Sequence, residues 1–129
     1  MMTAAAKRYE CTVTVEVEFI PDQSDVARNR YAFAYHIRII NTGNVSAQLI
    51  SRHWIIVEAS GDQQEVKGLG VVGAQPFLNP NDFFEYTSGT VLSTPMGEMH
   101  GTYQMVADDG VQFDATIQTF ALIMPRVLH

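Results

Sequence analysis

Three glycines are spaced as in the loops that bind nucleotide phosphates. They are Gly68, Gly70 and Gly73, in the pattern Gly-x-Gly-x-x-Gly. In a dinucleotide site this pattern follows a strand and opens a helix, whose N-terminal amides hold the pyrophosphate. A short strand precedes these glycines, but Pro76 and Pro80 follow them and no helical pattern does. The glycines therefore indicate turns, bulges or close backbone packing, and anion binding by bare amides is the alternative.

The charge around these glycines also argues against a phosphate ligand. Between residues 68 and 125 the sequence contains no Lys or Arg, and all of its charged side chains are acidic. They are Asp82, Glu85, Glu98, Asp108, Asp109 and Asp114. The whole chain has 8 basic and 14 acidic residues, which gives a net charge of −6. Nucleic acids and anionic membranes are bound mainly through Lys and Arg, so neither is an expected partner.

The histidines and the cysteine are too scattered to predict a metal site. The histidines are His36, His53, His100 and His129. They show neither the His-x-His nor the His-x-x-x-His spacing, and Cys11 stands alone, whereas a site needs converging ligands. Asp108 and Asp109 are oxygen donors, but with Gly110 they are typical of a tight turn. We therefore predict no metal site and no cofactor.

Nucleophilic catalysis is not predicted either. Ser88 lies in Thr-Ser-Gly rather than in a Gly-x-Ser-x-Gly turn, and no acid–base partner can be placed beside it. Cys11 shares its strand parity with Val13 and Val15, which indicates a buried structural thiol. The sequence therefore predicts no catalytic residue, and we do not expect an enzyme.

Side chains of the types that anchor protein interfaces occur at residues 52–54 and 93–103. The candidates for a partner surface are Arg52, His53, Met96, Met99 and Tyr103. A core position is the alternative for Tyr103 and for the neighbouring Trp54. The loops at residues 68–76 and 93–98 are the expected recognition elements, since loops carry most binding function.

Length and composition predict one domain. The chain has 129 residues, of which 47% are hydrophobic and 17% charged, and this balance excludes disorder. A single cysteine favours a reducing compartment, the cytoplasm. No stretch approaches the ~20 apolar residues that cross a bilayer. We expect a flexible leader over residues 1–9, a domain over residues 10–124 and a short tail over residues 125–129.

The apolar pattern predicts strands and no substantial helix. Strict alternation over residues 11–20 and 31–40 is typical of half-buried strands. Between residues 48 and 57 the alternation changes phase, so either a bulge shifts the parity or both faces are covered. Further strand character lies at residues 65–67, 82–87, 90–92, 99–107 and 111–122.

The last of these segments needs a bulge near residues 118 and 119 to keep both of its apolar sets on the core. Asp108-Asp109-Gly110 predicts the hairpin turn that precedes it. A total of about seven to nine short antiparallel strands with frequent turns predicts an all-β sandwich, and Trp54 suits the centre of such a core.

Five segments together resemble a known family. They are Arg52-His53-Trp54 and residues 68–76, 84–89, 93–99 and 101–105. In this order they resemble the ApaG family, also called CorD, over about residues 10–123. One departure is Asn81, where the family pattern has a glycine after Pro80; a turn can use Asn there, so the departure puts little in doubt.

The resemblance implies an immunoglobulin- or fibronectin-III-like β-sandwich and no established enzymatic activity. It also implies a link by name to cobalt resistance and magnesium efflux, and a gene neighbourhood shared with a diadenosine-tetraphosphate hydrolase. Related domains occur in eukaryotic F-box proteins and in a DNA-polymerase-δ-interacting protein, where their implied role is to bind other proteins.

We therefore expect a non-enzymatic cytoplasmic domain that binds another protein, one with a basic surface. An apolar sheet edge would also allow a homodimer. The alternative is a module for a small ligand, in which the loop from Gly68 to Gly73 binds a nucleotide, a pyrophosphate or a divalent cation.

Overall fold

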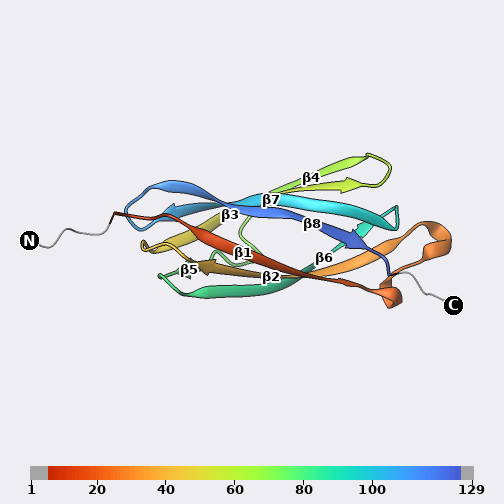
Figure 1. Cartoon of the computed structure of the whole chain (residues 1–129), viewed down its shortest axis with the longest axis horizontal. Helices are drawn as coiled ribbons and strands as arrows, with labels where there is room; N and C mark the ends of the chain where they lie inside the picture. Colours follow the sequence, from red (N-terminus) through yellow and green to blue (C-terminus); the bar gives the residue numbers. More distant parts are fainter. Residues whose placement is uncertain (1–5, 126–129) are drawn as a thin grey trace, which may run out of the picture.

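The computed structural model describes residues 6–125, and its regular structure is almost entirely β-strand (Figure 1). The strands are β1 (Cys11–Phe19), β2 (Tyr31–Asn41), β3 (Ala47–Glu58), β4 (Gln63–Leu69), β5 (Phe77–Leu78), β6 (Phe83–Leu92), β7 (Met96–Ala107) and β8 (Gln112–Ile123). Two short 3-10 turns, η1 (Pro21–Gln23) and η2 (Val26–Arg28), lie between β1 and β2.

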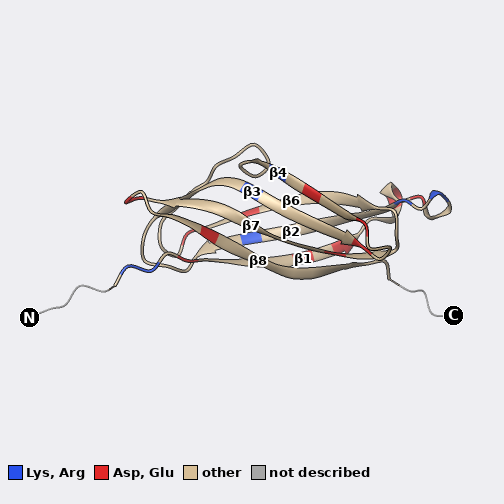
Figure 2. Ribbon diagram, turned by 90° about the horizontal axis from the view of Figure 1, so that it is seen from above, with Lys and Arg blue, Asp and Glu red and all other residues tan. Residues whose placement is uncertain are grey.

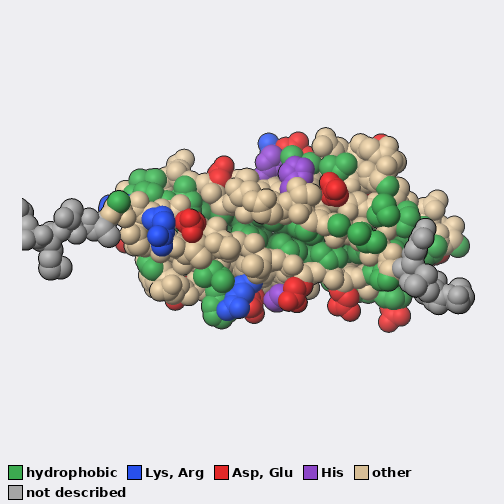
Figure 3. Space-filling view, viewed as in Figure 1, with side chains coloured by type: hydrophobic (Ala, Val, Ile, Leu, Met, Phe, Trp, Pro, Cys, Tyr) green, Lys and Arg blue, Asp and Glu red, His purple; other side chains and the backbone are tan. Residues whose placement is uncertain are grey.

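The strands form two antiparallel sheets that stack face to face. One sheet has the order β1-β2-β6, and the other has the order β4-β3-β7-β8, with β5 paired to the start of β3. In Figure 1 the second sheet forms the upper layer, and in Figure 3 hydrophobic side chains line the seam between the layers. The all-β sandwich predicted from the sequence is confirmed.

The core is organised around the indole of Trp54 on β3, which is only 3% exposed. The ring of Tyr35 on β2 lies 5.5 Å from the indole, and the ring of Phe120 on β8 lies 5.9 Å from it, both edge-on. Such edge-to-face pairs stabilise a core beyond the area that they bury. The central position predicted for Trp54 is confirmed.

Two β-bulges keep apolar side chains on the core where the sequence pattern changes phase. In β3 the register against β7 shifts between Leu49 and Ser51, which makes Ile50 the extra residue. In β8 the register shifts so that residues 118 and 119 together lie opposite His100. The bulge predicted for β8 is confirmed. For β3, where the sequence left open a bulge or two covered faces, the structure has the bulge.

Strand pairing extends several strands beyond their predicted limits. The segments expected at residues 82–87 and 90–92 form one strand, β6, because Ser88 and Gly89 pair with Tyr35 and Ala34 of β2. Strand β7 begins at residue 96 rather than 99. Hydrogen bonds to a neighbouring strand here override the weak strand preference of Ser and Gly.

The sandwich has two long sides of different kinds. On one of them β1 and β8, the edge strands of the two sheets, lie against each other. On the other the edges are β4 and β6, and Figure 2 shows β4 on the side opposite to β1 and β8. We call these the closed side (β1 and β8) and the open side (β4 and β6).

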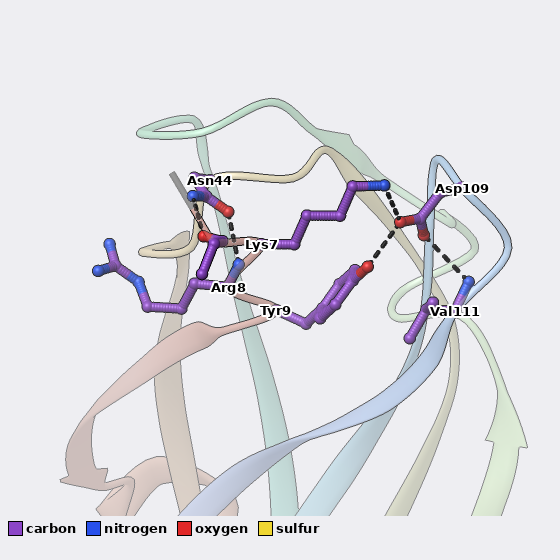
Figure 4. Close-up of polar contacts among 7 residues, drawn as sticks. Lys7, Arg8, Tyr9, Asn44, Asp109 and Val111 are labelled. Carbon is purple, nitrogen blue, oxygen red and sulfur yellow. Dashed lines mark hydrogen bonds and ion pairs between the residues drawn. The ribbon is translucent and has the colours of Figure 1, made fainter. Parts of the chain in front are cut away.

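A strap of residues 6–10 fastens one end of the closed side. The side chain of Asn44 accepts a hydrogen bond from the Arg8 amide at 2.6 Å and donates one to the Ala6 carbonyl at 2.9 Å (Figure 4). A Cβ atom on Gly43 would lie 2.2 Å from the Arg8 carbonyl oxygen, so this close approach requires glycine. Residues 6 and 8 of the predicted flexible leader are therefore hydrogen-bonded to the loop after β2.

Residues 1–5 of the predicted leader and residues 126–129 of the predicted tail lie outside the described residues.

The strap is also bound to the turn between β7 and β8, through contacts of Lys7 and Tyr9 with Asp109 that we call the clasp. Lys7 Nζ lies 2.8 Å from an Asp109 carboxylate oxygen, and the Tyr9 hydroxyl donates to the same oxygen at 2.6 Å (Figure 4). The Tyr9 ring packs 5.9 Å from the ring of Phe113. The predicted hairpin turn at residues 108–110 is confirmed. This turn binds a segment that is distant in the sequence, since Lys7 and Asp109 are 102 positions apart.

Candidate functional site

The glycine loop (residues 68–76) joins β4 to β5 on the open side, and it is held by Arg52 of β3. The guanidinium of Arg52 donates from Nη1 to the carbonyls of Leu69 and Gly70, each at 3.0 Å. A Cβ atom on Gly68 would lie 2.8 Å from this nitrogen. Gly68 therefore leaves room for the guanidinium, which lies on the inner face of the sheet.

The other two glycines serve the backbone of the loop. Val71 and Ala74 exchange two backbone hydrogen bonds, of 2.8 and 2.9 Å, across a turn whose central residues have φ of 44° and 80°. Positive φ at both central positions defines a type I′ turn. The second of these residues is Gly73, whereas Gly70 (φ 64°) precedes the turn and approaches the Ala74 carbonyl so closely that a Cβ would lie 2.4 Å from it.

These positions match the structural interpretation of the Gly-x-Gly-x-x-Gly pattern. The amides of Gly70 and Val71 donate to the carbonyls of Ile50 and Ala74, so these two amides are not free to hold a phosphate. The loop leads into β5 rather than into a helix. The arrangement that a dinucleotide site needs is therefore not formed.

Val72, the first central residue of the turn, is both strained and exposed. A β-branched residue at positive φ is an outlier, and such conformations cost about 1–3 kcal/mol. The surrounding contacts impose this one, since Gln75 Nε2 donates to the Ile50 carbonyl at 2.9 Å and the Leu49 amide donates to the Pro76 carbonyl at 3.0 Å. The residue is nevertheless 61% exposed.

Two more large apolar side chains are exposed on the same segment. Leu69, at the end of β4, is 75% exposed, and Phe77, at the start of β5, is 52% exposed. Figure 2 shows the glycine loop curling outward beside β4, at the margin of the sandwich. We call Leu69, Val72 and Phe77 the apolar loop residues. In the loop at residues 68–76, Leu69, Val72, Gly73 and Gln75 are exposed, as the sequence predicts, whereas Gly70 and Val71 are buried.

The residues predicted to form a partner surface are not brought together. Met99 (1% exposed) and Tyr103 (0%) are buried, so their assignment to a surface is wrong. The reason is strand parity, because both occupy inward positions of β7. The core alternative was the correct one for Tyr103. Met96 is exposed, but it lies beside the end of β3, far along that strand from the glycine loop.

Arg52 and His53 lie on opposite faces of β3, because successive residues of a strand alternate. His53 is on the outer face, where its Nε2 lies 2.6 Å from a carboxylate oxygen of Glu65. The hydrogen bond from His53 lowers the pKa of the exposed Glu65 carboxyl below its usual value, and Lys67 makes a smaller contribution in the same direction.

This His–carboxylate pair does not complete a catalytic arrangement. A nucleophile must be hydrogen-bonded to its base, and the nearby hydroxyl of Ser51 donates instead to Gln104 at 2.8 Å. Across residues 6–125, no group of three or more His, Cys, Asp or Glu side chains could hold a metal ion. Cys11 is buried, as predicted, and burial raises the pKa of its thiol to about 11.

A buried pair of tyrosines lies beside Arg52 inside the open side. The hydroxyls of Tyr86 (β6) and Tyr103 (β7) are hydrogen-bonded to each other between the sheets. Burial raises the pKa of Tyr86 to about 12 and that of Tyr103 still further, while the Arg52 cation acts in the opposite direction on both. Sequence reasoning missed this pair, since neither tyrosine lies in a polar pattern.

Together, the two antiparallel sheets and the loop held by Arg52 define a β-sandwich domain with one exposed, apolar loop on its open side. Residues 6–125 contain no helical segment with the length and hydrophobicity of a membrane span. Residues 21–107 match the ApaG domain family, and the chain belongs to that family.

Similar proteins support the same assignment over nearly the whole chain. The ApaG protein of Methylobacillus flagellatus is 63% identical over 123 residues, which cover 95% of this chain and 97% of the relative. The ApaG protein of Nitrosospira multiformis is 60% identical and covers 98% of this chain and 99% of its own. A crystal structure from Bordetella pertussis, solved under the name ApaA, superposes with a TM-score of 0.90 at 51% identity, over 95% of this chain and 100% of the other.

Proposed function

We propose that this chain is a non-enzymatic cytoplasmic domain that binds a partner protein through its glycine loop. The observation that carries the proposal is Val72, a β-branched residue held at φ 44° while 61% exposed. Backbone strain of this kind persists where the surrounding structure enforces it, and it is concentrated at functional sites. Leu69 and Phe77 add apolar surface on the same segment, and exposed apolar surface is typical of protein-binding sites.

Charge and chemistry elsewhere in the chain support the other parts of the proposal. The acidic balance of residues 68–125 favours a partner whose surface around the contact is basic. The single cysteine supports a reducing compartment. The role in protein binding that the resemblance implies for related domains is of the same kind. Any link to cobalt resistance or magnesium efflux would then act through the partner.

The alternative, a small ligand in the glycine loop, has less support. The amides of Gly70 and Val71 are already bonded to protein carbonyls, and the guanidinium of Arg52 donates to the loop rather than facing away from it. Titration of the labelled chain with pyrophosphate or Mg²⁺ tests it directly. Saturable NMR shifts centred on residues 68–73 would favour the ligand, and the absence of shifts at millimolar concentration would remove it.

The proposal is tested by quantitative affinity capture with three forms of the chain. These are the natural sequence, the Val72→Asn variant and the Val26→Asn variant. Asn tolerates positive φ, so the Val72→Asn variant keeps the turn and loses only the apolar side chain. Val26 is a matched control, since it is 51% exposed on η2, outside the glycine loop.

We expect a defined set of proteins to be captured by the natural chain and the Val26→Asn variant, and lost from the Val72→Asn variant. Equal capture by all three forms would contradict the role of the loop. Failure to enrich any protein over an unrelated β-sandwich would contradict the role in protein binding.

A further inference from the structure

The free edge of β6 is long and poorly protected. Along β6 every residue from 83 to 92 is paired with β2 on one side, and among residues 6–125 no backbone hydrogen bond joins β6 to another strand on its other side. Natural edge strands are usually shielded by Lys, Pro or a bulge. β6 has none of these devices, and Glu85 is its only charged residue.

The three-stranded sheet is also one strand narrower than the β4-β3-β7-β8 path of the other sheet. Because β1 lies against β8 on the closed side, the missing strand is on the open side, next to β6 and facing β4. A strand added to β6 would occupy this position. Its alternate side chains would point inward, toward the inner face of β4.

A cation without an acidic partner lies on that inner face. Arg52 makes its two hydrogen bonds from Nη1 alone, and in the described part of the chain it forms no ion pair. Among the residues that the structure describes, its Nε and Nη2 make no hydrogen bond, and they are not among the buried atoms that lack a partner, which leaves them accessible to solvent. By contrast, Arg38 and Lys67 each lie beside a glutamate.

We propose that β6 accepts an extended segment of a partner protein as an added strand, and that an Asp or Glu at an inward position of this segment pairs with Arg52. The inference rests on the proposed function and names the chemistry of the partner. Main-chain hydrogen bonds to β6 supply affinity, and the charge-assisted bond to the guanidinium supplies specificity. The basic surface expected of the partner surrounds this single acidic position.

A second copy of this chain does not meet the requirement. If two β6 edges paired with each other, the inward side chains offered to Arg52 would come from β6 itself. Those side chains are Phe84, Tyr86, Ser88, Thr90 and Leu92, and none is a carboxylate. Self-pairing would therefore leave the guanidinium without an acidic partner.

The test uses the whole chain, labelled with ¹⁵N, and a set of capped heptapeptides. In these peptides Thr occupies the odd positions, while the even positions vary among Val, Ile, Tyr and Glu with one Glu in each. We expect members of the set to produce saturable shifts in the amides of residues 83–92 and in the Arg52 side chain. Replacing the Glu of the best binder by Gln should weaken binding about tenfold, because a charge-assisted bond is lost. This exchange leaves the protein unaltered.

An N-methylated form of the same peptide is the control for strand pairing, and we expect it not to bind. The proposal is overturned if no peptide binds saturably at millimolar concentration, or if the shifts lie on β4 or β8 instead. Equal affinity of the Glu and Gln peptides would overturn the role of Arg52. A dimer of the free chain with β6 amides protected from exchange would also overturn it, since the second copy would then be the occupant.

Failure here is distinguishable from failure of the proposed function. If peptides do not bind β6 while the Val72→Asn variant still loses its captured proteins, the glycine loop alone is the interface. If peptides bind β6 while all three forms capture the same proteins, the β6 edge stands and the role of the loop does not.

Discussion

The closed and open sides of the sandwich differ in whether a cation meets an acidic partner. On the closed side a glycine, a cation and a tyrosine all act within the chain: Gly43 admits the strap, and Lys7 and Tyr9 meet Asp109. On the open side Arg52 has no acidic partner among residues 6–125, and Val72 is strained and exposed. On the closed side the cation is thus paired with a carboxylate of the chain, whereas on the open side the cation bonds only to backbone carbonyls.

The largest expected effect is on the closed side, at Gly43. In the Gly43→Ala variant the new Cβ would lie 2.2 Å from the Arg8 carbonyl oxygen, so the strap must move. We expect the free energy of unfolding to fall by about 2 kcal/mol, as for other overpacked sites. Urea denaturation measures it.

Gly110→Ala is the control for this variant. Gly110 has positive φ (89°), but no atom lies within 4 Å of its added Cβ, so only the backbone conformation is strained. We expect a loss of about 1 kcal/mol there. If the two variants lose the same stability, the close approach of the strap is not what Gly43 provides.

The next effect compares a buried tyrosine with a half-buried one. Tyr103→Phe removes one hydroxyl of the buried pair and leaves that of Tyr86 without this partner, so we expect a loss of about 1.5 kcal/mol in the free energy of unfolding. Tyr9→Phe removes an exposed hydrogen bond to Asp109, and we expect less than about 0.5 kcal/mol. Thermal unfolding of both variants measures the difference. A larger loss of stability for Tyr9→Phe would contradict this expectation, because the hydrogen bond of Tyr9 on the closed side would then contribute more than the buried one between Tyr86 and Tyr103.

The open side should become more stable when its strain is removed. Val72→Asn places Asn-Gly, the preferred pair of a type I′ turn, at residues 72 and 73. We expect the free energy of unfolding to rise by about 1 kcal/mol, while Val26→Asn leaves it nearly unchanged. Urea denaturation of both variants checks this. A stability that falls in Val72→Asn would mean that the valine is held for packing rather than for presentation.

The sequence predicted the parts of this fold that depend on local alternation. The phase changes in β3 and β8 indicated bulges, and Trp54 and Cys11 were correctly expected inside. Contacts between distant segments could not be predicted in this way. The contacts of residues 6–9 with Gly43 and Asn44 are revealed by no local pattern near the N-terminus.

The surface residues were harder to predict, because the type of a residue does not reveal on which face of its strand the side chain lies. Met99 and Tyr103 are of interface types but lie at inward positions of β7, and Arg52 and His53 are adjacent in sequence but face opposite ways. The strain at Val72 was not predictable at all. It arises because the turn is fixed by its bonds to β3, whatever residue occupies the position.

The smallest expected effect is the pH dependence of the clasp on the closed side. The hydrogen bonds from Lys7 and Tyr9 lower the pKa of Asp109 from 3.8 to about 2. Because the folded-state pKa is below the unfolded value, the clasp contributes its full stability above pH 3.8 and loses it as the pH falls toward 2. A carboxyl ¹³C titration should show this low midpoint, and the Lys7→Gln variant should move it upward toward the usual value. An Asp109 that titrates at its usual value in the natural chain would mean that the strap is not fastened, and the closed side would then be as available to partners as the open one.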